Sequence, residues 1–366
     1  MGNFYYMKIG ILTHHTVVNF GAFLQAYALQ EAVKELYPDA DVKIINFIHI
    51  KHFLINTLGW FMYYKNRQNV RHLLNIYALP FTLKRIRKKY LHLTPLCFSS
   101  SAINRMNFDA IIVGSDEVWN YGDHKSFNAI KFGQGLACKK LISYAPSIGN
   151  SDLNNIPHIV SDGLKRFNHL SARDVNTKLL AEKVTGRLIT EVLDPTFLYP
   201  LKSESNPYLP KSKYILFYYC EHLPSKIKTQ IFAYAAQHNL KILGAGESDR
   251  DYDQCTVNMT PFQWIEMFRH AQFVFTGTFH GVVFSILNNR QFKVYLTNKG
   301  RVAKVGALLD SLGITGRIID EDYEFDLAAQ DHEIDYNSVQ AEIEKKRRVS
   351  IKYLQNAISS NDDTVS

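Results

Sequence analysis

Short apolar runs alternate with longer segments of helical spacing along most of this 366-residue chain. In the first half, short apolar runs predict strands over 8–13, 42–47, 108–113, 140–144 and 170–174. Apolar residues at helical spacing predict helices over 22–37 and 175–185. In the second half, the predicted strands are 214–219, 241–244, 273–276 and 291–296, and the predicted helices are 226–238, 261–270 and 282–288. This alternation predicts mostly parallel sheets covered on both faces.

A stretch rich in Pro, Ser and Lys at 200–213 is typical of a linker between two such halves. We therefore expect an α/β protein made of two Rossmann-like domains that face a cleft. The first domain would span 1–200 and carry a helical insertion at about 50–106, and the second would span 201–335. Residues 336–366 would form a charged, amphipathic helix that packs back on the first half, followed by a tail.

The composition is that of a well-packed globular protein, with 46% hydrophobic and 13% aromatic residues. Its four cysteines have no CxxC spacing, which predicts reduced thiols in a cytosolic setting and argues against a disulfide framework or a zinc site. We expect no secretory signal, and no apolar run reaches the roughly 18 residues that a membrane span needs.

The net charge of +8 is unevenly spread, because residues 42–108 contain 11 of the 42 basic residues and no Asp or Glu. This segment is also aromatic, with Phe53, Trp60, Phe61, Tyr63, Tyr64, Tyr77, Phe81 and Tyr90. Cations mixed with such rings suit an anionic membrane surface. Nucleic acid is the competing anion, and a solvated pair of helices packed on the body is the non-functional alternative. Because the segment has bulky apolar clusters, we expect peripheral membrane contact through about 50–95 and no nucleic acid.

His280 stands between Gly277 and Gly281, where the predicted strand 273–276 gives way to a helix. Such a position lies at the carboxyl edge of a sheet, where α/β proteins bind ligands. The helix that follows would direct its N–H groups and positive dipole end to the same place. This pattern favours a bound anion beside a proton-transfer group. The alternative is a histidine that caps a turn in a core crossover.

Four further motifs fall at predicted strand ends: Asn19-Phe20-Gly21, Gly114-Ser115-Asp116, Ser143-Tyr144-Ala145 and Arg173-Asp174. Each is weak alone, since such residues also make turns and helix caps. Together with Phe279-His280-Gly281 and Asp194-Pro195-Thr196, they resemble the polysaccharide pyruvyl transferase family from about residue 8 to 320. The resemblance implies a fold like that of GT-B glycosyltransferases. It also implies transfer of the enolpyruvyl carbons of phosphoenolpyruvate onto two sugar hydroxyls, which yields a pyruvate ketal in capsule or exopolysaccharide biosynthesis.

The resemblance also implies roles for single residues. His280 would be the catalytic acid/base, and the donor would be bound by Arg173, Lys304, Thr278, Gly281 and Arg301. Arg173 alone would suggest a pair with Asp174 or a surface salt bridge, and Lys299 and Arg301 are alternatives to Lys304. Several family members carry arginine at the position of Thr278. Threonine has no charge, so another cation must compensate or donor binding must differ.

The acceptor sugar would be bound by Asn19, Gly21, Asp116 and Asn120, although Asp116 could instead cap a following helix. We expect no metal and no cofactor, with phosphoenolpyruvate as co-substrate and a polyprenyl-diphosphate-linked saccharide as acceptor at the cytoplasmic face of the membrane. Two alternatives stay open. One is a glycosyltransferase that uses a nucleotide sugar, with Glu247 or Asp249 on the ribose. The other is a non-catalytic membrane-associated scaffold.

Overall fold

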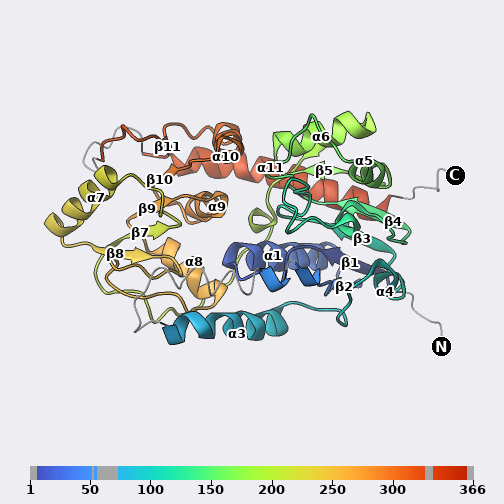
Figure 1. The fold of residues 1–366 in the computed structure, drawn as a ribbon, viewed down its shortest axis with the longest axis horizontal. Helices are drawn as coiled ribbons and strands as arrows, with labels where there is room; N and C mark the ends of the chain where they lie inside the picture. The colour runs from blue at the N-terminus through green and yellow to red at the C-terminus, as the bar shows by residue number, and fades with distance from the viewer. Residues whose placement is uncertain (1–5, 52, 56–72, 326–332, 361–366) are drawn as a thin grey trace. The chain divides into compact units, whose positions relative to one another are not determined.

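The computed structural model describes residues 6–51, 53–55, 73–325 and 333–360, and these form two compact units (Figure 1). The first unit takes its described residues from 1–58, 85–201 and 344–366. The second takes them from 59–84 and 202–343. Each unit has its own parallel β-sheet and its own helices, and each is described by itself below.

The first unit is built on a four-stranded parallel sheet in the order β2-β1-β3-β4. Its strands are β1 (Lys8–Leu12), β2 (Asp41–Ile44), β3 (Ala110–Val113) and β4 (Lys140–Ser143). A two-stranded sheet pairs β5 (Ser171–Ala172) with β6 (Thr190–Glu191). The helical elements are α1 (Phe20–Leu36), α4 (Ser100–Asn104), η2 (Ala129–Phe132), α5 (His158–Lys165), α6 (Val175–Thr185) and η3 (Pro195–Phe197).

The second unit contains a five-stranded parallel sheet in the order β11-β10-β9-β7-β8. Its strands are β7 (Tyr214–Tyr218), β8 (Lys241–Gly244), β9 (Phe273–Thr276), β10 (Phe292–Tyr295) and β11 (Ile318–Ile319). Its helices are α7 (Ser225–Gln237), α8 (Pro261–Arg269), α9 (Phe279–Leu287) and α10 (Lys299–Ser311). Two further helices, α3 (Leu73–Tyr90) and α11 (Tyr336–Ser359), contribute residues to both units.

The predicted α/β class is confirmed, because parallel sheets alternate with helices in both units. Two elements near His280 differ from the sequence-based expectation. Helix α9 begins at Phe279 and not at 282, so His280 lies inside its first turn. Helix α10, which carries Lys304, was not predicted, because Gly300 and Gly306 interrupt its apolar spacing.

The basic segment contains helices α3 and α4, and Trp60, Phe61, Tyr63 and Tyr64 lie outside the described residues. One side of α3 is buried through Ile76, Leu79, Leu83 and Ile86. The opposite side is exposed and consists of Leu74, Tyr77 and Phe81 followed by Lys84, Arg85, Lys88 and Lys89. Because the exposed residues recur at helical spacing, the outer stripe of α3 is apolar in its first half and basic in its second.

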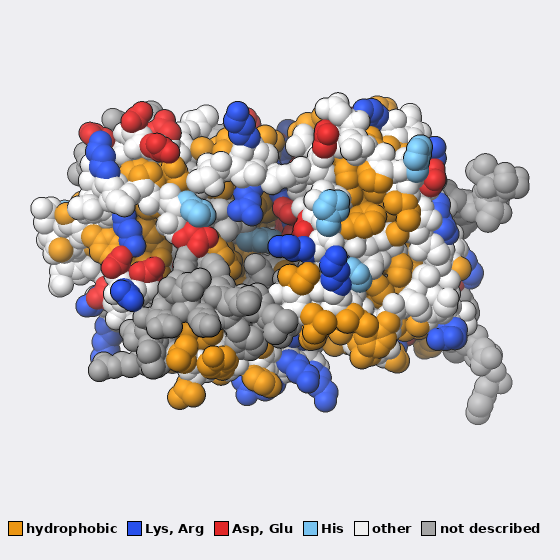
Figure 2. All heavy atoms as spheres, in the orientation of Figure 1, with side chains coloured by type: hydrophobic (Ala, Val, Ile, Leu, Met, Phe, Trp, Pro, Cys, Tyr) orange, Lys and Arg blue, Asp and Glu red, His pale blue; other side chains and the backbone are white. Residues whose placement is uncertain are grey.

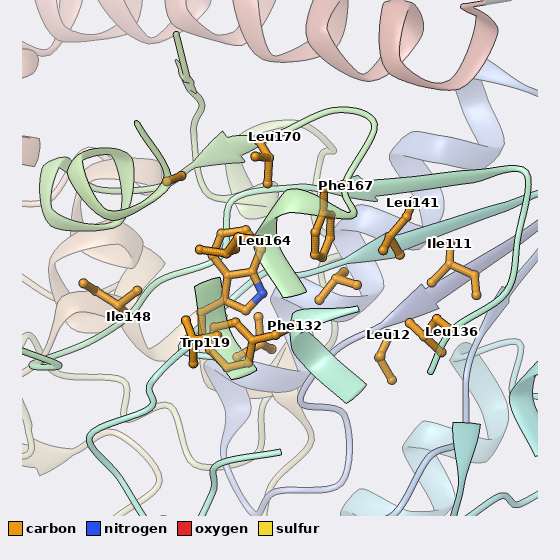
Figure 3. Packing of buried hydrophobic residues seen from close by; sticks show 14 of the residues in the cluster. Leu12, Ile111, Trp119, Phe132, Leu136, Leu141, Ile148, Leu164, Phe167 and Leu170 are labelled. Carbon is orange, nitrogen blue, oxygen red and sulfur yellow. The ribbon is translucent and has the colours of Figure 1, made fainter. Parts of the chain in front are cut away.

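An aromatic core fixes the loops that follow β3 in the first unit (Figure 3). The Trp119 ring stacks on Phe132 at 5.9 Å and meets Phe167 edge-on at 5.4 Å. The Trp119 indole N–H also donates to the carbonyl of Lys131 at 2.8 Å. The chain after β3 and the 3₁₀ turn η2 are therefore held against one another by buried contacts on both sides.

Both sheets reverse their strand order at one point. In the first sheet the chain steps from β1 to β2 and returns past β1 to β3, so the reversal lies between β1 and β3. In the second sheet it lies between β7 and β9 for the same reason. Ligands of open α/β sheets bind outside the carboxyl ends of the strands at such a point. His14 and Asp116 flank the first reversal, and Tyr219 and His280 flank the second.

Candidate active site

His280 occupies the first turn of α9, directly after β9. Its partly buried imidazole packs near two rings, with centroid distances of 5.9 Å to Phe279 and 6.4 Å to Phe284. The position places a proton-transfer group at the positive end of a helix dipole and at the carboxyl edge of the sheet. The structure therefore gives His280 the surroundings that the sequence pattern predicted, while its catalytic role stays a prediction.

Gly281 allows α9 to approach the end of β9 closely. A Cβ atom at Gly281 would lie 1.9 Å from Oγ1 of Thr276, a distance that no real contact tolerates. The N–H of Gly281 donates to Oγ1 of Thr278 at 3.0 Å. Glycine at this position therefore fixes where the first turn of α9, and with it His280, begins.

Thr278 is the N-cap residue of α9. Its backbone N–H donates to Oγ1 of Thr276 at 3.2 Å, while its own hydroxyl accepts from Gly281. Threonine is a favourable N-cap residue, whereas the arginine expected from other family members cannot cap in this way. The change to threonine thus exchanges a positive charge for a helix cap.

Helix α10 supplies a cation next to this turn. The Lys304 ammonium lies 4.6 Å from the centroid of the Phe279 ring, so it contacts the residue beside His280. Lys299 and Arg301, the alternatives from sequence, are exposed at the start of α10. Among these three cations, the geometry favours Lys304 as the one that could act beside His280, because it contacts Phe279.

Arg173 lies in the first unit, after β5, and is almost completely buried. It donates from Nη1 to Asp194 at 2.7 Å and from Nη2 to Asp116 at 3.2 Å. Burial alone lowers the pKa of Arg173, but the charges of Asp194 and Asp116 outweigh it and raise the pKa above its ordinary value. A predicted donor residue and a predicted acceptor residue thus meet in one ion-pair cluster, and the expected partner Asp174 instead caps α6.

Asp116 does not cap a helix, and that alternative was wrong. It has φ 77°, and irregular chain follows it as far as η2. Its carbonyl accepts from the N–H of Ser147 at 2.8 Å, which ties the end of β3 to the chain after β4. The carboxylate of Asp116 accepts from Arg173, while its backbone carbonyl makes the contact with Ser147.

The remaining predicted acceptor residues have local structural contacts. Asn19 caps α1, since its Oδ1 accepts from the N–H of Ala22 at 3.0 Å. Gly21 is buried within the first turn of α1. The Asn120 amide oxygen accepts from Ser151 at 3.1 Å and its nitrogen donates to Glu117 at 3.3 Å. Binding of a sugar by these residues stays a prediction.

The sequence reasoning missed Lys131, which is only 4% exposed although lysine side chains are rarely buried. Its ammonium lies 3.0 Å from Nδ1 of His14, the residue that follows Thr13 at the end of β1. The adjacent His15 is buried against Asn46 at 3.1 Å. The adjacent histidines His14 and His15 are the one local signal in the sequence at this place. Among the described residues, no group of His, Cys, Asp and Glu is arranged to hold a metal ion.

The acidic residues considered for a nucleotide ribose already bind backbone groups. A Glu247 carboxylate oxygen accepts from the N–H of Tyr219 at 2.7 Å, and Asp249 accepts from the N–H of Asp251 at 3.2 Å. Glu247 is 5% exposed, and its contact with Tyr219 fixes the chain directly after β7. These contacts give both carboxylates structural roles, so they do not favour the nucleotide-sugar alternative.

A family model of polysaccharide pyruvyl transferases matches residues 19–295. The chain belongs to this family. The match spans the capping motif of α1, the Arg173 cluster and the His280 turn, so the predicted resemblance is confirmed. Structural neighbours of this pyruvyl transferase family member agree with the predicted GT-B-like fold class. A UDP-N-acetylglucosamine 2-epimerase has a TM-score of 0.50 at 12% identity, with 96% of this chain and 91% of the epimerase covered.

Two transferases are also similar in structure at lower scores. The glycosyltransferase SnogD from Streptomyces nogalater has a TM-score of 0.48 at 10% identity, with 96% and 98% of the two chains covered. The heptosyltransferase WaaC from E. coli, solved with ADP, has a TM-score of 0.41 at 13% identity, with 93% and 100% covered. No curated protein matches the chain. Identities this low carry no information about substrates.

Proposed function

We propose that this pyruvyl transferase moves the enolpyruvyl group of phosphoenolpyruvate onto two hydroxyls of a saccharide and forms a pyruvate ketal. The observation that carries the proposal is the His280 turn, where an imidazole, a helix N-terminus and the Lys304 ammonium meet at the carboxyl edge of a sheet. That combination suits a substrate that is an anion and must also receive a proton.

The reaction proceeds in two balanced steps. In the first, one sugar oxygen bonds to C2 of the donor, its proton leaves to a base, and C3 takes a proton from His280. In the second, the other sugar oxygen bonds to C2 while the bond to the phosphate oxygen breaks, and the hydroxyl proton leaves with the released phosphate. No electrons are gained or lost, so the reaction needs acid–base groups and anion binding but no redox partner.

Lys304 and the start of α9 would hold the donor. A cation beside the leaving phosphate stabilises the charge that develops as the C–O bond breaks. The helix dipole adds about 0.3–1 kcal/mol for an anion at its N-terminus. In this assignment Lys304 replaces the charge that Thr278 lacks. Arg173 would contribute through its cluster with Asp116, which holds the end of the first sheet in place.

The acceptor is proposed to be lipid-linked, with the enzyme docked on an anionic membrane surface at the cytoplasmic face. The support is the outer stripe of α3, where Leu74 and Phe81 are 82% and 72% exposed and lead into a run of cations. Figure 2 shows hydrophobic and basic side chains together along the edge where Figure 1 draws α3. Rings and chains of this kind enter the headgroup region while Lys and Arg pair with lipid phosphates. Among the described residues, no helix is long and apolar enough to cross a bilayer.

The test of the proposed reaction is phosphate release from phosphoenolpyruvate with a panel of lipid-linked and free saccharides, followed by the product mass. We expect acceptor-dependent phosphate and a pyruvyl mass gain, both lost in His280→Gln. His270→Gln is a matched control, because His270 is an exposed histidine at the end of α8 in the same unit. No phosphate with any acceptor, together with turnover of a nucleotide sugar, would overturn the proposal in favour of glycosyl transfer.

A further inference from the structure

A pocket of about 420 Å³ lies within the first unit, at the amino ends of β5 and β6. Residues 168–170 and 187–190, which lead into these two strands, form one wall, and α11 forms the other. The volume falls in the range of roughly 300–1,000 Å³ that is usual for small-molecule sites. The pocket shares no residue with the Arg173 cluster, so it is a separate feature of this unit.

The α11 wall is one face of a regular helix. Its lining residues recur at intervals of three and four, as Val349, Lys352, Tyr353, Asn356 and Ala357. The Tyr353 hydroxyl donates to the carbonyl at the end of β4 at 2.9 Å, and the ring lies 6.4 Å from that of Tyr144. The helix is therefore fixed against the sheet, and the pocket is a permanent part of the fold.

The lining carries positive charge without a matching carboxylate. It contains Arg187 and Lys352, and none of the described residues that line it is Asp or Glu. Within the described part of the chain, the Lys352 ammonium has no hydrogen-bond or ion-pair partner. The guanidinium of Arg187 donates once, from Nη1 to the carbonyl of Asn168 at 3.1 Å. This contact holds the group in place and leaves most of its five N–H donors for a ligand.

The carboxyl end of α11 does not explain these cations. Helix-end carbonyls attract positive charge only within the last turn, and the last turn of α11 contains no basic residue. Its Ile358 carbonyl instead accepts from Nζ of Lys140 at 2.6 Å, on the sheet side of the helix. Lys352 lies about two turns earlier and is therefore available for another anion.

The pocket is also apolar in part. Leu170, Ile189 and Ala357 are buried in its lining, whereas Leu188 is 97% exposed and Val349 is 49% exposed. An almost fully exposed leucine beside cations offers apolar contact area that the protein itself does not cover. A ligand that fits both features is an anion that also carries an apolar group.

We propose that this pocket binds a small phosphate monoester with an apolar substituent. The Arg187 fork would take two phosphate oxygens, and Lys352 would supply the second positive charge for the dianion. The substituent would lie on Leu188 and Val349. The site is independent of the proposed pyruvyl transfer, since it uses none of the residues assigned to that reaction.

The test is calorimetric titration of the full-length protein with phenyl phosphate, which combines a phosphate with one apolar ring. We expect a Kd below about 1 mM, and weaker binding by at least about fivefold for inorganic phosphate. Arg187→Met and Lys352→Glu should each raise the Kd by about tenfold or more. Lys352 is exposed on α11, so the second variant should fold normally, and thermal unfolding verifies this.

Two control variants separate this pocket from other cations. Arg348→Met removes an exposed charge from the same helix outside the pocket, and Lys304→Met removes the cation of the His280 turn. Both should bind phenyl phosphate within about twofold of the wild type. No binding by the wild type, equal binding by Lys352→Glu, or a loss in Lys304→Met would overturn the pocket. Binding to phosphatidylglycerol vesicles without binding to phenyl phosphate would also overturn it. None of these results bears on whether phosphoenolpyruvate turns over, so the two proposals fail separately.

Discussion

The guanidinium of Arg173 donates to the carboxylate of Asp194 at 2.7 Å, and the two side chains are only 2% and 1% exposed. Asp194 is held in turn by Thr196, whose N–H and hydroxyl both donate to its other oxygen. The Asp194-Pro195-Thr196 motif therefore holds its carboxylate in a fixed position against Arg173. A cation that is this well paired stabilises the sheet edge of the first unit, whatever it also does for the donor.

Replacing Arg173 should therefore cost stability as well as activity. Arg173→Met leaves Asp194 buried without its partner, and we expect the free energy of unfolding to fall by about 3–5 kcal/mol. Urea unfolding of the single variant and of Arg173→Met with Asp194→Asn measures this, and the double variant should recover part of the loss. An unchanged stability for Arg173→Met would show that the pair is not formed in solution.

Lys304 should be the cation that binds the donor. Lys304→Met removes the charge beside Phe279, so KM for phosphoenolpyruvate should rise by about tenfold or more. Arg301→Met is the matched control, because Arg301 is exposed on the same helix and we expect its kinetics to stay within about twofold of the wild type. Equal effects of the two substitutions would contradict the assignment.

Gly281 should be intolerant of any side chain. Gly281→Ala places a methyl group on Oγ1 of Thr276, and the resulting strain should lower the free energy of unfolding by about 1–3 kcal/mol. Gly306→Ala is the control, since Gly306 lies inside α10 with its nearest neighbour at 3.8 Å. Alanine is the better helix former, so this variant should gain up to about 1 kcal/mol. Similar stabilities for both variants would show that α9 and β9 are not so close.

His15 should make the first unit sensitive to mild acid. Burial lowers the pKa of His15 to about 4, against 6.5 for a histidine in water. As the pH falls from 6.5, the unfolded chain therefore binds this proton before the folded one does, and stability is lost between about pH 6.5 and 4. The loss amounts to about 3 kcal/mol.

The measurement is the free energy of unfolding at pH 7 and at pH 4.5 for the wild type and for His15→Gln. Glutamine can still bind Asn46 but does not titrate, so its stability should fall less over this range. Parallel falls in the two proteins would exclude His15 as a source of the acid sensitivity.

The outer stripe of α3 should bind anionic vesicles. Each basic residue near such a surface contributes about 1 kcal/mol, so replacing Lys84, Arg85 and Lys88 by alanine should lower the partition coefficient by about two orders of magnitude at low salt. Sedimentation with phosphatidylglycerol vesicles measures the effect. The control replaces three exposed lysines elsewhere, Lys125, Lys165 and Lys211, by alanine. Equal losses would point to net charge, and no binding by the wild type would overturn the docking proposal.

Much of the framework could be predicted from sequence, because buried parallel strands are short apolar runs and the motifs sit where these runs stop. Strands β7, β8 and β9 fall within one residue of their predicted ranges. The position of His280 after β9 followed from the same pattern. The start of α9 could not be predicted in this way. Thr278, Phe279 and His280 give no clear helix signal, and Gly281, which packs against Thr276, interrupts the apolar spacing.

The rest depends on contacts between residues that are far apart in the chain. Arg173 and Asp194 are 21 residues apart, and their motifs were seen separately but not as a pair. Lys131 is 117 residues from His14, and lysine side chains are rarely buried, so the sequence around it does not reveal the contact. The burial of a lysine is set by the aromatic core around Trp119, which a local pattern does not reveal.

The most direct test of the central claim is the reaction run in D₂O with phosphoenolpyruvate and a saccharide that turns over, with the product examined by mass and NMR. Protonation of C3 by His280 predicts a ketal whose methyl group carries one deuterium, formed together with one phosphate and lost in His280→Gln. A product without deuterium in the methyl group, or a ketal formed equally well by His280→Gln, would contradict the account.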